Sequence, residues 1–202
     1  MNYTIDLTEI EEYNTHKANI DIKNAALLVI EMQNVFKSDM EIISDNQVSN
    51  IKNIIDWSEK CGAKVIYVRH NDSSPLSQPL INWWNGDKIE YGSEGWQIIE
   101  GFNTTGKTII DKNQYSAFFE TNLDNLLKSQ SIKDIIVTGV MANCCCETTA
   151  RDAFMRGYRV FFISDATATT CKDLHLATLK NLSFGFACIK SSHDLISELE
   201  NK

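Results

Sequence analysis

DIIVTGVMANCCCETTARDA, residues 134–153, is the stretch that decides the fold of this chain. Its apolar start, Ile135–Val137, predicts a buried strand, and Gly139 is expected to end that strand. From about Asn143 the residues predict a helix. A strand that turns tightly into a helix exposes side chains beside unpaired helix amides. Three thiols fall at this junction: Cys144, Cys145 and Cys146. The helix dipole there favours thiolate, which makes the junction the best candidate site.

Length and composition limit the class of protein. The 202 residues predict one domain, 1–202, with a polar lead-in over residues 1–23. A net charge of −8 without a basic stripe argues against nucleic acid as a partner. No apolar run approaches the roughly 20 residues that span a bilayer, and the acidic N-terminus is no signal peptide, so we expect a cytoplasmic protein without membrane contact. The six cysteines include no C-x-x-C pair, which favours reduced thiols.

Strands and helices alternate along the chain. This alternation predicts a three-layer α/β/α sandwich, Rossmann-like, around a six-stranded, mostly parallel sheet. Besides the strand at 135–137, the expected strands are Ala25–Ile30, Lys64–Val68, Thr108–Ile110, Arg159–Ile163 and Phe186–Ile189. Besides the helix after Asn143, the expected helices cover 8–13, 47–61, 121–127, 172–182 and 194–199. The segment 71–106 is irregular and holds three of the four tryptophans, which is typical of a functional loop.

Polar side chains follow the first four strands at the point where each strand ends. They are Glu31, His70, Lys112 and Cys145. Ligands of parallel sheets bind beyond these carboxyl ends, so we expect the four side chains at one site. Glu31 can accept the thiol proton as a general base and return it to a leaving amine. Lys112 can stabilise negative charge, and Cys145 can attack a carbonyl carbon. A structural ion pair between Glu31 and Lys112 is the alternative reading.

Four ordered motifs carry a resemblance to a known family. They are LLVIEMQNVF at 27–36, IIDKNQYSAFFETNLDNLL at 109–127, GVMANCCCETTARDA at 139–153 and GYRVFFISDATAT at 157–169. From about Ala25 to Ile189 the chain resembles the isochorismatase-like cysteine hydrolases. That family includes nicotinamidases, N-carbamoylsarcosine and ureidoacrylate amidohydrolases, and isochorismatases. The resemblance implies a six-stranded parallel sheet flanked by helices, no cofactor, and a homodimer or homotetramer.

The resemblance also assigns roles to residues. It implies that Glu31 is the acid/base, Lys112 the electrostatic stabiliser and Cys145 the nucleophile. It further implies a cis peptide between Val140 and Met141, with an oxyanion hole formed by the backbone N–H groups of Met141 and Cys145. Isochorismatases proper lack the nucleophilic cysteine, so Cys145 favours hydrolysis of a C–N bond in a small amide or carbamoyl compound through a thioester.

Two departures from the family pattern affect the expected chemistry. Glu31 stands where the family has aspartate, which extends the carboxylate by one methylene. A misplacement of about 1 Å can cost on the order of a hundredfold in rate. Metal-dependent nicotinamidases carry an Asp-x-His stretch, whereas this chain has His70-Asn71-Asp72 and no further histidine until His175. We therefore expect no metal.

Aromatic faces suit a flat substrate and mark candidates for the walls of a pocket. Trp83 and Trp84 are equally compatible with a subunit interface, and His70 with a hydrogen-bonded strand end. Cys144 and Cys146 are read as packing residues and Asp165 as structural. The full set of expected substrate-binding residues is Gln33, Phe36, His70, Trp83, Trp84, Tyr115 and Phe119.

Three other functions remain open from the sequence. The same pocket is compatible with vinyl-ether or lactam hydrolysis. Glu31 is also compatible with a catalytically impaired relative that binds a ligand without turnover. The run Cys144–Cys146 is compatible with a redox-sensing thiol protein.

Overall fold

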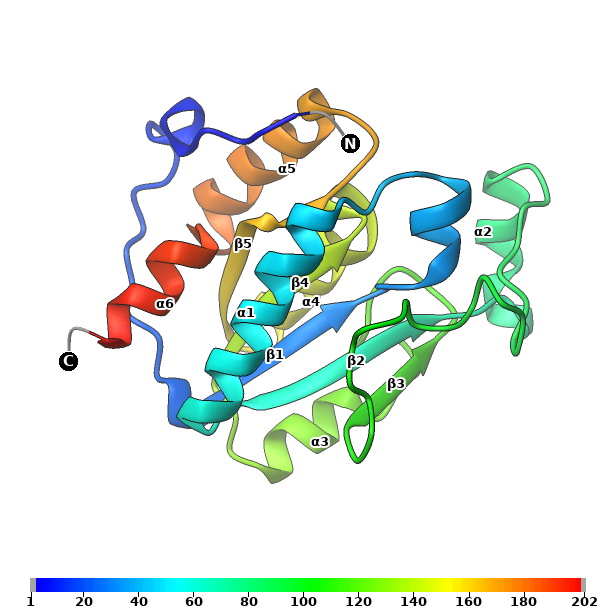
Figure 1. The fold of residues 1–202 in the computed structure, drawn as a ribbon, viewed down its shortest axis with the longest axis horizontal. Helices are drawn as coiled ribbons and strands as arrows, with labels where there is room; N and C mark the ends of the chain where they lie inside the picture. The colour runs from blue at the N-terminus through cyan, green and yellow to red at the C-terminus, as the bar shows by residue number, and fades with distance from the viewer. Residues whose placement is uncertain (1–2, 201–202) are drawn as a thin grey trace.

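The computed structural model describes the backbone of residues 3–200 and the side chains of residues 3–198. Six parallel strands form one sheet in the order β3-β2-β1-β4-β5-β6 (Figure 1). The predicted fold class is confirmed. The strands are β1 Ala25–Ile30, β2 Lys64–His70, β3 Thr108–Lys112, β4 Asp134–Val140, β5 Arg159–Ala168 and β6 Cys188–Lys190.

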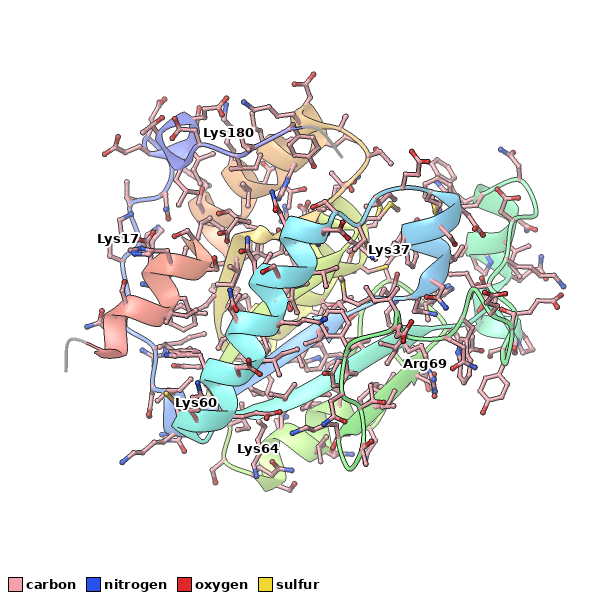
Figure 2. The ribbon with its side chains drawn as sticks, viewed as in Figure 1. Lys17, Lys37, Lys60, Lys64, Arg69 and Lys180 are labelled. Atoms are coloured by element: carbon pink, nitrogen blue, oxygen red, sulfur yellow. The ribbon has the colours of Figure 1, made fainter. Side chains whose placement is uncertain are left out.

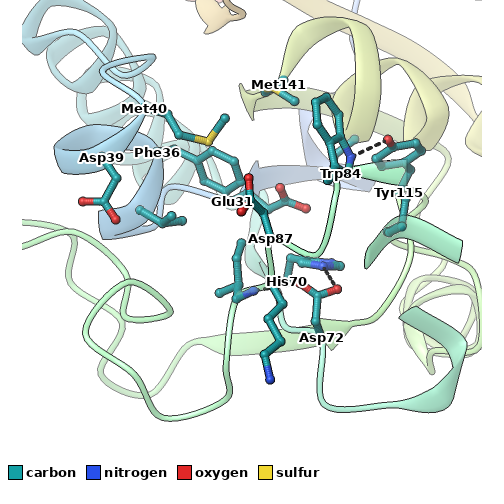
Figure 3. A pocket seen from close by; sticks show the side chains of 15 residues that line it. Glu31, Phe36, Asp39, Met40, His70, Asp72, Trp84, Asp87, Tyr115 and Met141 are labelled. Carbon is teal, nitrogen blue, oxygen red and sulfur yellow. Dashed lines mark hydrogen bonds and ion pairs between the residues drawn. The ribbon is translucent and has the colours of Figure 1, made fainter. Parts of the chain in front are cut away.

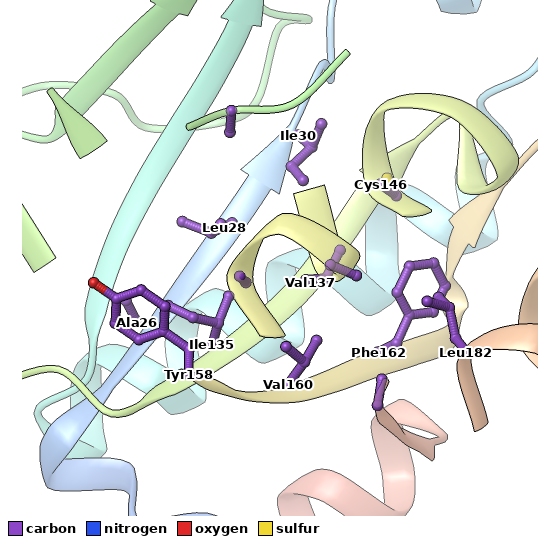
Figure 4. Close-up of a cluster of buried hydrophobic side chains, with 14 of the residues drawn as sticks. Ala26, Leu28, Ile30, Ile135, Val137, Cys146, Tyr158, Val160, Phe162 and Leu182 are labelled. Carbon is purple, nitrogen blue, oxygen red and sulfur yellow. The ribbon is translucent and has the colours of Figure 1, made fainter. Parts of the chain in front are cut away.

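Helices cover both faces of the sheet and make the three layers. They are α1 Asp45–Cys61, α2 Gln78–Trp83, α3 Leu123–Ser129, α4 Glu147–Met155, α5 Lys172–Gly185 and α6 Ser192–Glu200. Successive strand residues point to opposite faces. Ala26, Leu28 and Ile30 of β1 therefore pack with α3, α4 and α5 (Figure 4), whereas the alternate residues of β1 pack with α1 and α6. Two apolar clusters, one on each face, hold the sheet between the helices.

Several boundaries differ from those predicted. β4 does not end at Gly139 but continues to Val140, with a shift of register between Val137 and Gly139. Gly139 has a φ of 112°, and a Cβ there would overlap the carbonyl oxygen of Ile30. The glycine therefore permits β1 and β4 to approach closely, rather than ending the strand.

Other segments also depart from their predicted extents. β5 runs through Ser164 to Ala168 instead of ending at Ile163, and β6 begins at Cys188 instead of Phe186. The expected helix over 8–13 is a single 3₁₀ turn, Leu7–Ile10. Single turns also occur at Ile22–Asn24, Val35–Asp39, Pro75–Ser77 and Ala142–Cys146.

Basic side chains come from many elements of the described chain. Figure 2 shows the labelled basic side chains spread around the fold, with Lys17 and Lys180 at one end and Lys37 and Arg69 at the other. Within the described residues, every helix is too short or too polar to cross a lipid bilayer.

Candidate active site

Three buried side chains meet beyond the carboxyl ends of β1, β3 and β4. The Lys112 ammonium forms an ion pair with the Glu31 carboxylate. It also donates to the Cys145 Sγ atom at 3.6 Å and to the Gln114 carbonyl oxygen at 2.8 Å. Lys112 is 1% exposed, Glu31 2% and Cys145 5%. The sequence predicted that these three residues would converge, and the structure brings them together.

Glu31 owes its position to an abrupt change of backbone direction after β1. Its φ of 50° lies in the left-handed region, which is rare for a residue with a long side chain and is found at functional sites. Its N–H still donates to the Val68 carbonyl oxygen of β2 at 2.8 Å. The sheet therefore fixes the backbone of Glu31 while the strand path ends.

Cys145 lies in the turn Ala142–Cys146, which runs directly into α4. The peptide between Val140 and Met141 is cis, as the family resemblance implied. The Met141 carbonyl oxygen accepts the N–H groups of Cys144 and Cys146, both at 3.1 Å. This wide turn holds Cys145 at the edge of a cavity that Met141 also lines.

The electrostatics correct one expectation. The helix dipole was expected to favour a thiolate, but burial, followed by the nearby Glu31 carboxylate, raises the pKa of Cys145 well above its ordinary value. Lys112 opposes this effect without overcoming it. Burial also works against a charged Lys112, yet Cys145 and Glu31 raise the pKa of Lys112 above its usual value. The resting site therefore holds a neutral thiol beside an ammonium–carboxylate pair.

The cavity in front of Cys145 has a volume of about 470 Å³. Four of the expected substrate-binding residues line it: Phe36, His70, Trp84 and Tyr115. Phe36 lies on one side and the Trp84–Tyr115 pair on the other, with Glu31 between them (Figure 3). The Trp84 indole N–H donates to the Tyr115 hydroxyl at 3.1 Å. This size and these aromatic walls suit a small flat molecule.

The structure does not bring the other three expected residues to the cavity. The amide of Gln33 is buried and bonds to backbone, accepting from the His70 N–H and donating to the His70 and Trp96 carbonyl oxygens. Trp83 is 75% exposed and Phe119 44%, and neither lines the cavity. Gln33 therefore supports the wall from behind, since its polar atoms are already engaged.

Several lining residues were not expected from the sequence. Most come from the irregular segment 71–106, where no spacing rule predicts which side chains turn inward. The remainder come from the single turn after β1. The unexpected lining residues are Val35, Asp39, Met40, Asp72, Leu80, Asp87, Lys88 and Ile89. The Asn85-Gly86-Asp87 stretch after the double tryptophan indicates a turn, but it gives no signal for which of these side chains lines the cavity.

His70 and Asp72 form a hydrogen-bonded pair in the wall. The His70 Nε2 and Asp72 Oδ1 atoms are 2.8 Å apart, and Asp72 Oδ2 accepts the Ile89 N–H at 2.8 Å. Although burial works against a charged carboxyl, the hydrogen bonds from His70 and Ile89 lower the pKa of Asp72 below its usual value. Within the described part of the chain, no group of three or more His, Cys, Asp or Glu side chains is placed to hold a metal ion.

Residues read as structural from the sequence have structural contacts. Both carboxylate oxygens of Asp165 accept hydrogen bonds from Ser192, at the start of α6. Cys146 is fully buried in the cluster under α4, and Cys144 is half-buried beside it. Burial first, then Glu31, raises the pKa of Cys144 to about 11.

Comparison with known proteins gives a consistent result. A family model described as the isochorismatase domain matches residues 25–194. Nicotinamidase 3 of Arabidopsis thaliana is 46% identical over 180 residues, which cover 87% of this chain and 89% of that protein. The resemblance inferred from the four sequence motifs is thereby confirmed.

Solved structures share the fold. A cysteine hydrolase from Pseudomonas syringae pv. phaseolicola 1448A superposes with a TM-score of 0.84 at 24% identity, covering 92% of this chain and 96% of that chain. N-carbamoylsarcosine amidase from Thermoplasma acidophilum gives a TM-score of 0.69 at 26% identity, covering 84% of this chain and 96% of that chain.

Proposed function

The chain belongs to the isochorismatase family, and on that premise we propose that it is a cysteine hydrolase cleaving the C–N bond of a small amide or carbamoyl compound. One observation carries the proposal: Lys112 contacts both Glu31 and Cys145 at the edge of a cavity of about 470 Å³. Its similarity to a nicotinamidase and to an N-carbamoylsarcosine amidase supports amide-type substrates.

The first half of the reaction forms a thioester. Because the Cys145 thiol is protonated at rest, its proton must leave as sulfur attacks the substrate carbonyl carbon. Glu31 is the acceptor, since its carboxylate lies within hydrogen-bonding reach of the thiol. The C–N bond then breaks, and the proton passes from Glu31 to the leaving amine.

The second half releases the product acid. Glu31 takes a proton from water, the resulting hydroxide attacks the thioester, and the proton returns to the Cys145 sulfur as the C–S bond breaks. Lys112 remains an ammonium throughout and stabilises the negative charge on sulfur. The backbone N–H groups of Met141 and Cys145 serve as the oxyanion hole for the tetrahedral intermediates.

Glu31 has the reach for this role despite its extra methylene. Its carboxylate contacts Lys112, and its backbone leaves the strand path at a φ of 50°. This contact with Lys112 supports a catalytic role for Glu31 over a purely ligand-binding relative. The assembly that we propose is a homodimer or homotetramer, to be measured by light scattering.

Ammonia release from nicotinamide, ureidoacrylate and carbamoyl compounds tests the proposal directly. We expect turnover of at least one primary amide, with an acyl adduct on Cys145 in the intact mass after rapid quenching. Glu31→Gln should abolish turnover, and Glu31→Asp should preserve or raise it. An unmodified Cys145 and no release from any compound would leave the ligand-binding alternative.

A further inference from the structure

Several side-chain donors that line the cavity already have hydrogen-bond partners, whereas some acceptors do not. Two of the cavity's side-chain N–H donors already have partners: the Trp84 indole bonds to Tyr115, and the Lys88 ammonium pairs with Glu90 at 2.7 Å. The His70 imidazole shares a proton with Asp72. Apart from the Tyr115 hydroxyl proton, the Cys145 thiol and the backbone N–H groups assigned to the oxyanion hole, the polar groups left over among the described lining residues are hydrogen-bond acceptors.

His70 supplies the most informative of these acceptors. Its side chain is 9% exposed, and its Nδ1 atom has no hydrogen-bond partner among the described residues. The ionised Asp72 carboxylate requires a proton on Nε2, so a neutral imidazole presents a lone pair at Nδ1. A buried acceptor without a partner is unfavourable, and because His70 lines the cavity, a donor on a bound ligand is the partner that we infer for it.

The charged side chains at the open end of the cavity, which we call the mouth, disfavour an anionic ligand. Asp39 and Asp87 line the cavity and are exposed, and no arginine is among the described residues that line it. The remaining lining cation, Lys88, is exposed and paired with Glu90. The buried Lys112 is already paired with Glu31. A substrate carboxylate would therefore meet carboxylates without a free cation to bind it.

We propose that the cavity selects an amide that donates a hydrogen bond to His70 Nδ1 and carries no carboxylate, so that His70 and the acidic mouth determine specificity. The inference rests on the proposed function of the same site and narrows its substrates to uncharged or cationic amides. His70 is a substrate-contacting residue in this account, and Asp72 is a positioning residue that fixes its tautomer.

Equilibrium binding tests the inference without turnover. Calorimetry on the Cys145→Ala protein, at about pH 8 where an imidazole is ordinarily neutral, compares three probes: benzamide, N,N-dimethylbenzamide and 3-carbamoylbenzoate. We expect benzamide to bind about tenfold tighter than either of the others, because the second lacks an N–H donor and the third carries a carboxylate. Equal affinities for benzamide and 3-carbamoylbenzoate would overturn the inference.

Variants separate the contribution of His70 to specificity from that of the acidic mouth. His70→Phe should remove the preference for benzamide over its dimethyl derivative, and Asp72→Asn should weaken it, which covers the case that the first variant does not fold. The double variant Asp39→Asn, Asp87→Asn should tighten binding of 3-carbamoylbenzoate about fivefold at low salt, and less at high salt because exposed charges are screened. The matched control Asp56→Asn, an exposed carboxylate on α1 outside the cavity, should change no affinity.

The outcomes distinguish this inference from the proposed hydrolysis. An unchanged dissociation constant in both the His70 and the Asp39/Asp87 variants contradicts the specificity account, whatever the turnover. If wild-type protein releases no ammonia from any amide while the binding preferences hold, the hydrolysis is wrong and the specificity account stands.

Discussion

The two sides of the cavity are built differently. The floor, defined as Glu31, Lys112 and Cys145, stands on three strands of one sheet and is almost completely buried. The wall, defined as the other side chains that line the cavity, comes mostly from the segment 71–106, which has little regular structure, and Trp84 within it is 40% exposed. Reactive groups are thus held by the sheet, whereas the groups that meet the rest of the substrate are held by a loop.

A few anchors hold the wall to the floor. The Gln33 amide joins the end of β2 to the Trp96 backbone. The Arg69 guanidinium lies 3.4 Å from the centroid of the Trp96 ring and forms two hydrogen bonds to Asp111. Changes in the floor should therefore alter the chemical step, and changes in the anchors should alter substrate binding.

Removing the nucleophile gives the largest expected effect. Cys145→Ala should lower kcat by on the order of 10⁴-fold or more, because covalent catalysis cannot proceed without the sulfur. The change is small and at the edge of a cavity, so the melting temperature should hardly move. Cys144→Ala is the matched control and should retain activity, measured as ammonia release. Equal losses in both variants would contradict the assignment of Cys145.

Breaking the floor ion pair should destabilise the fold as well as stop the reaction. Lys112→Met leaves the buried Glu31 carboxylate without its partner, which should cost about 3–5 kcal/mol of unfolding free energy. Lys107→Met, which breaks a partly exposed pair with Glu59, should cost about 1 kcal/mol or less. Urea denaturation of both variants measures the difference. Similar losses of unfolding free energy would mean that groups other than Lys112 stabilise the buried Glu31 carboxylate.

Gly139→Ala tests whether the close approach of β1 and β4 positions Glu31. A Cβ at Gly139 would overlap the Ile30 carbonyl oxygen, so one strand must shift. We expect a loss of about 1–3 kcal/mol and a fall in kcat of on the order of a hundredfold, with KM little changed. Gly106→Ala is the control, since Gly106 also has a positive φ but an open space for a Cβ. A change in KM without a change in kcat would contradict the view that the floor governs the chemical step and the wall governs substrate binding.

The sequence predicted the floor because parallel strands impose it. Glu31 directly follows β1, Lys112 is the last residue of β3 and the cysteine turn follows β4, so the parallel strands place all three at one edge of the sheet. The wall was only partly predictable. Trp84 and Trp83 are neighbours in the sequence, yet one lines the cavity and the other faces outward, since α2 ends there and contacts with distant residues decide the direction.

Gln33 shows a second limit of sequence reasoning. A polar residue two positions after Glu31 was expected to face the substrate. In the fold its amide binds the backbone of two distant segments instead. The thiolate expectation for Cys145 was wrong for a similar reason, because the burial and the Glu31 charge that raise the pKa of Cys145 depend on the packed structure.

Gln33→Leu should loosen the wall and leave the floor in place. The change leaves the His70 N–H and two carbonyl oxygens without their partner, at a cost of about 1–3 kcal/mol. KM should rise about tenfold while kcat falls less, as steady-state kinetics would show. Gln78→Leu, an exposed glutamine on α2 that bonds to Asn82, is the control and should change neither constant.

Tyr115→Phe should give the smallest effect and locate the border between floor and wall. The variant removes the hydroxyl that accepts the Trp84 N–H at 3.1 Å, but Trp84 is exposed enough for water to take its place. A net hydrogen bond of this kind is worth about 0.5–1.5 kcal/mol, so KM should rise about threefold with kcat unchanged. A hundredfold fall in kcat would instead place the Tyr115 hydroxyl beside the reacting atoms. Tyr115 lies three residues after Lys112, the last residue of β3. Such a result would therefore assign Tyr115 to the floor and remove it from the wall.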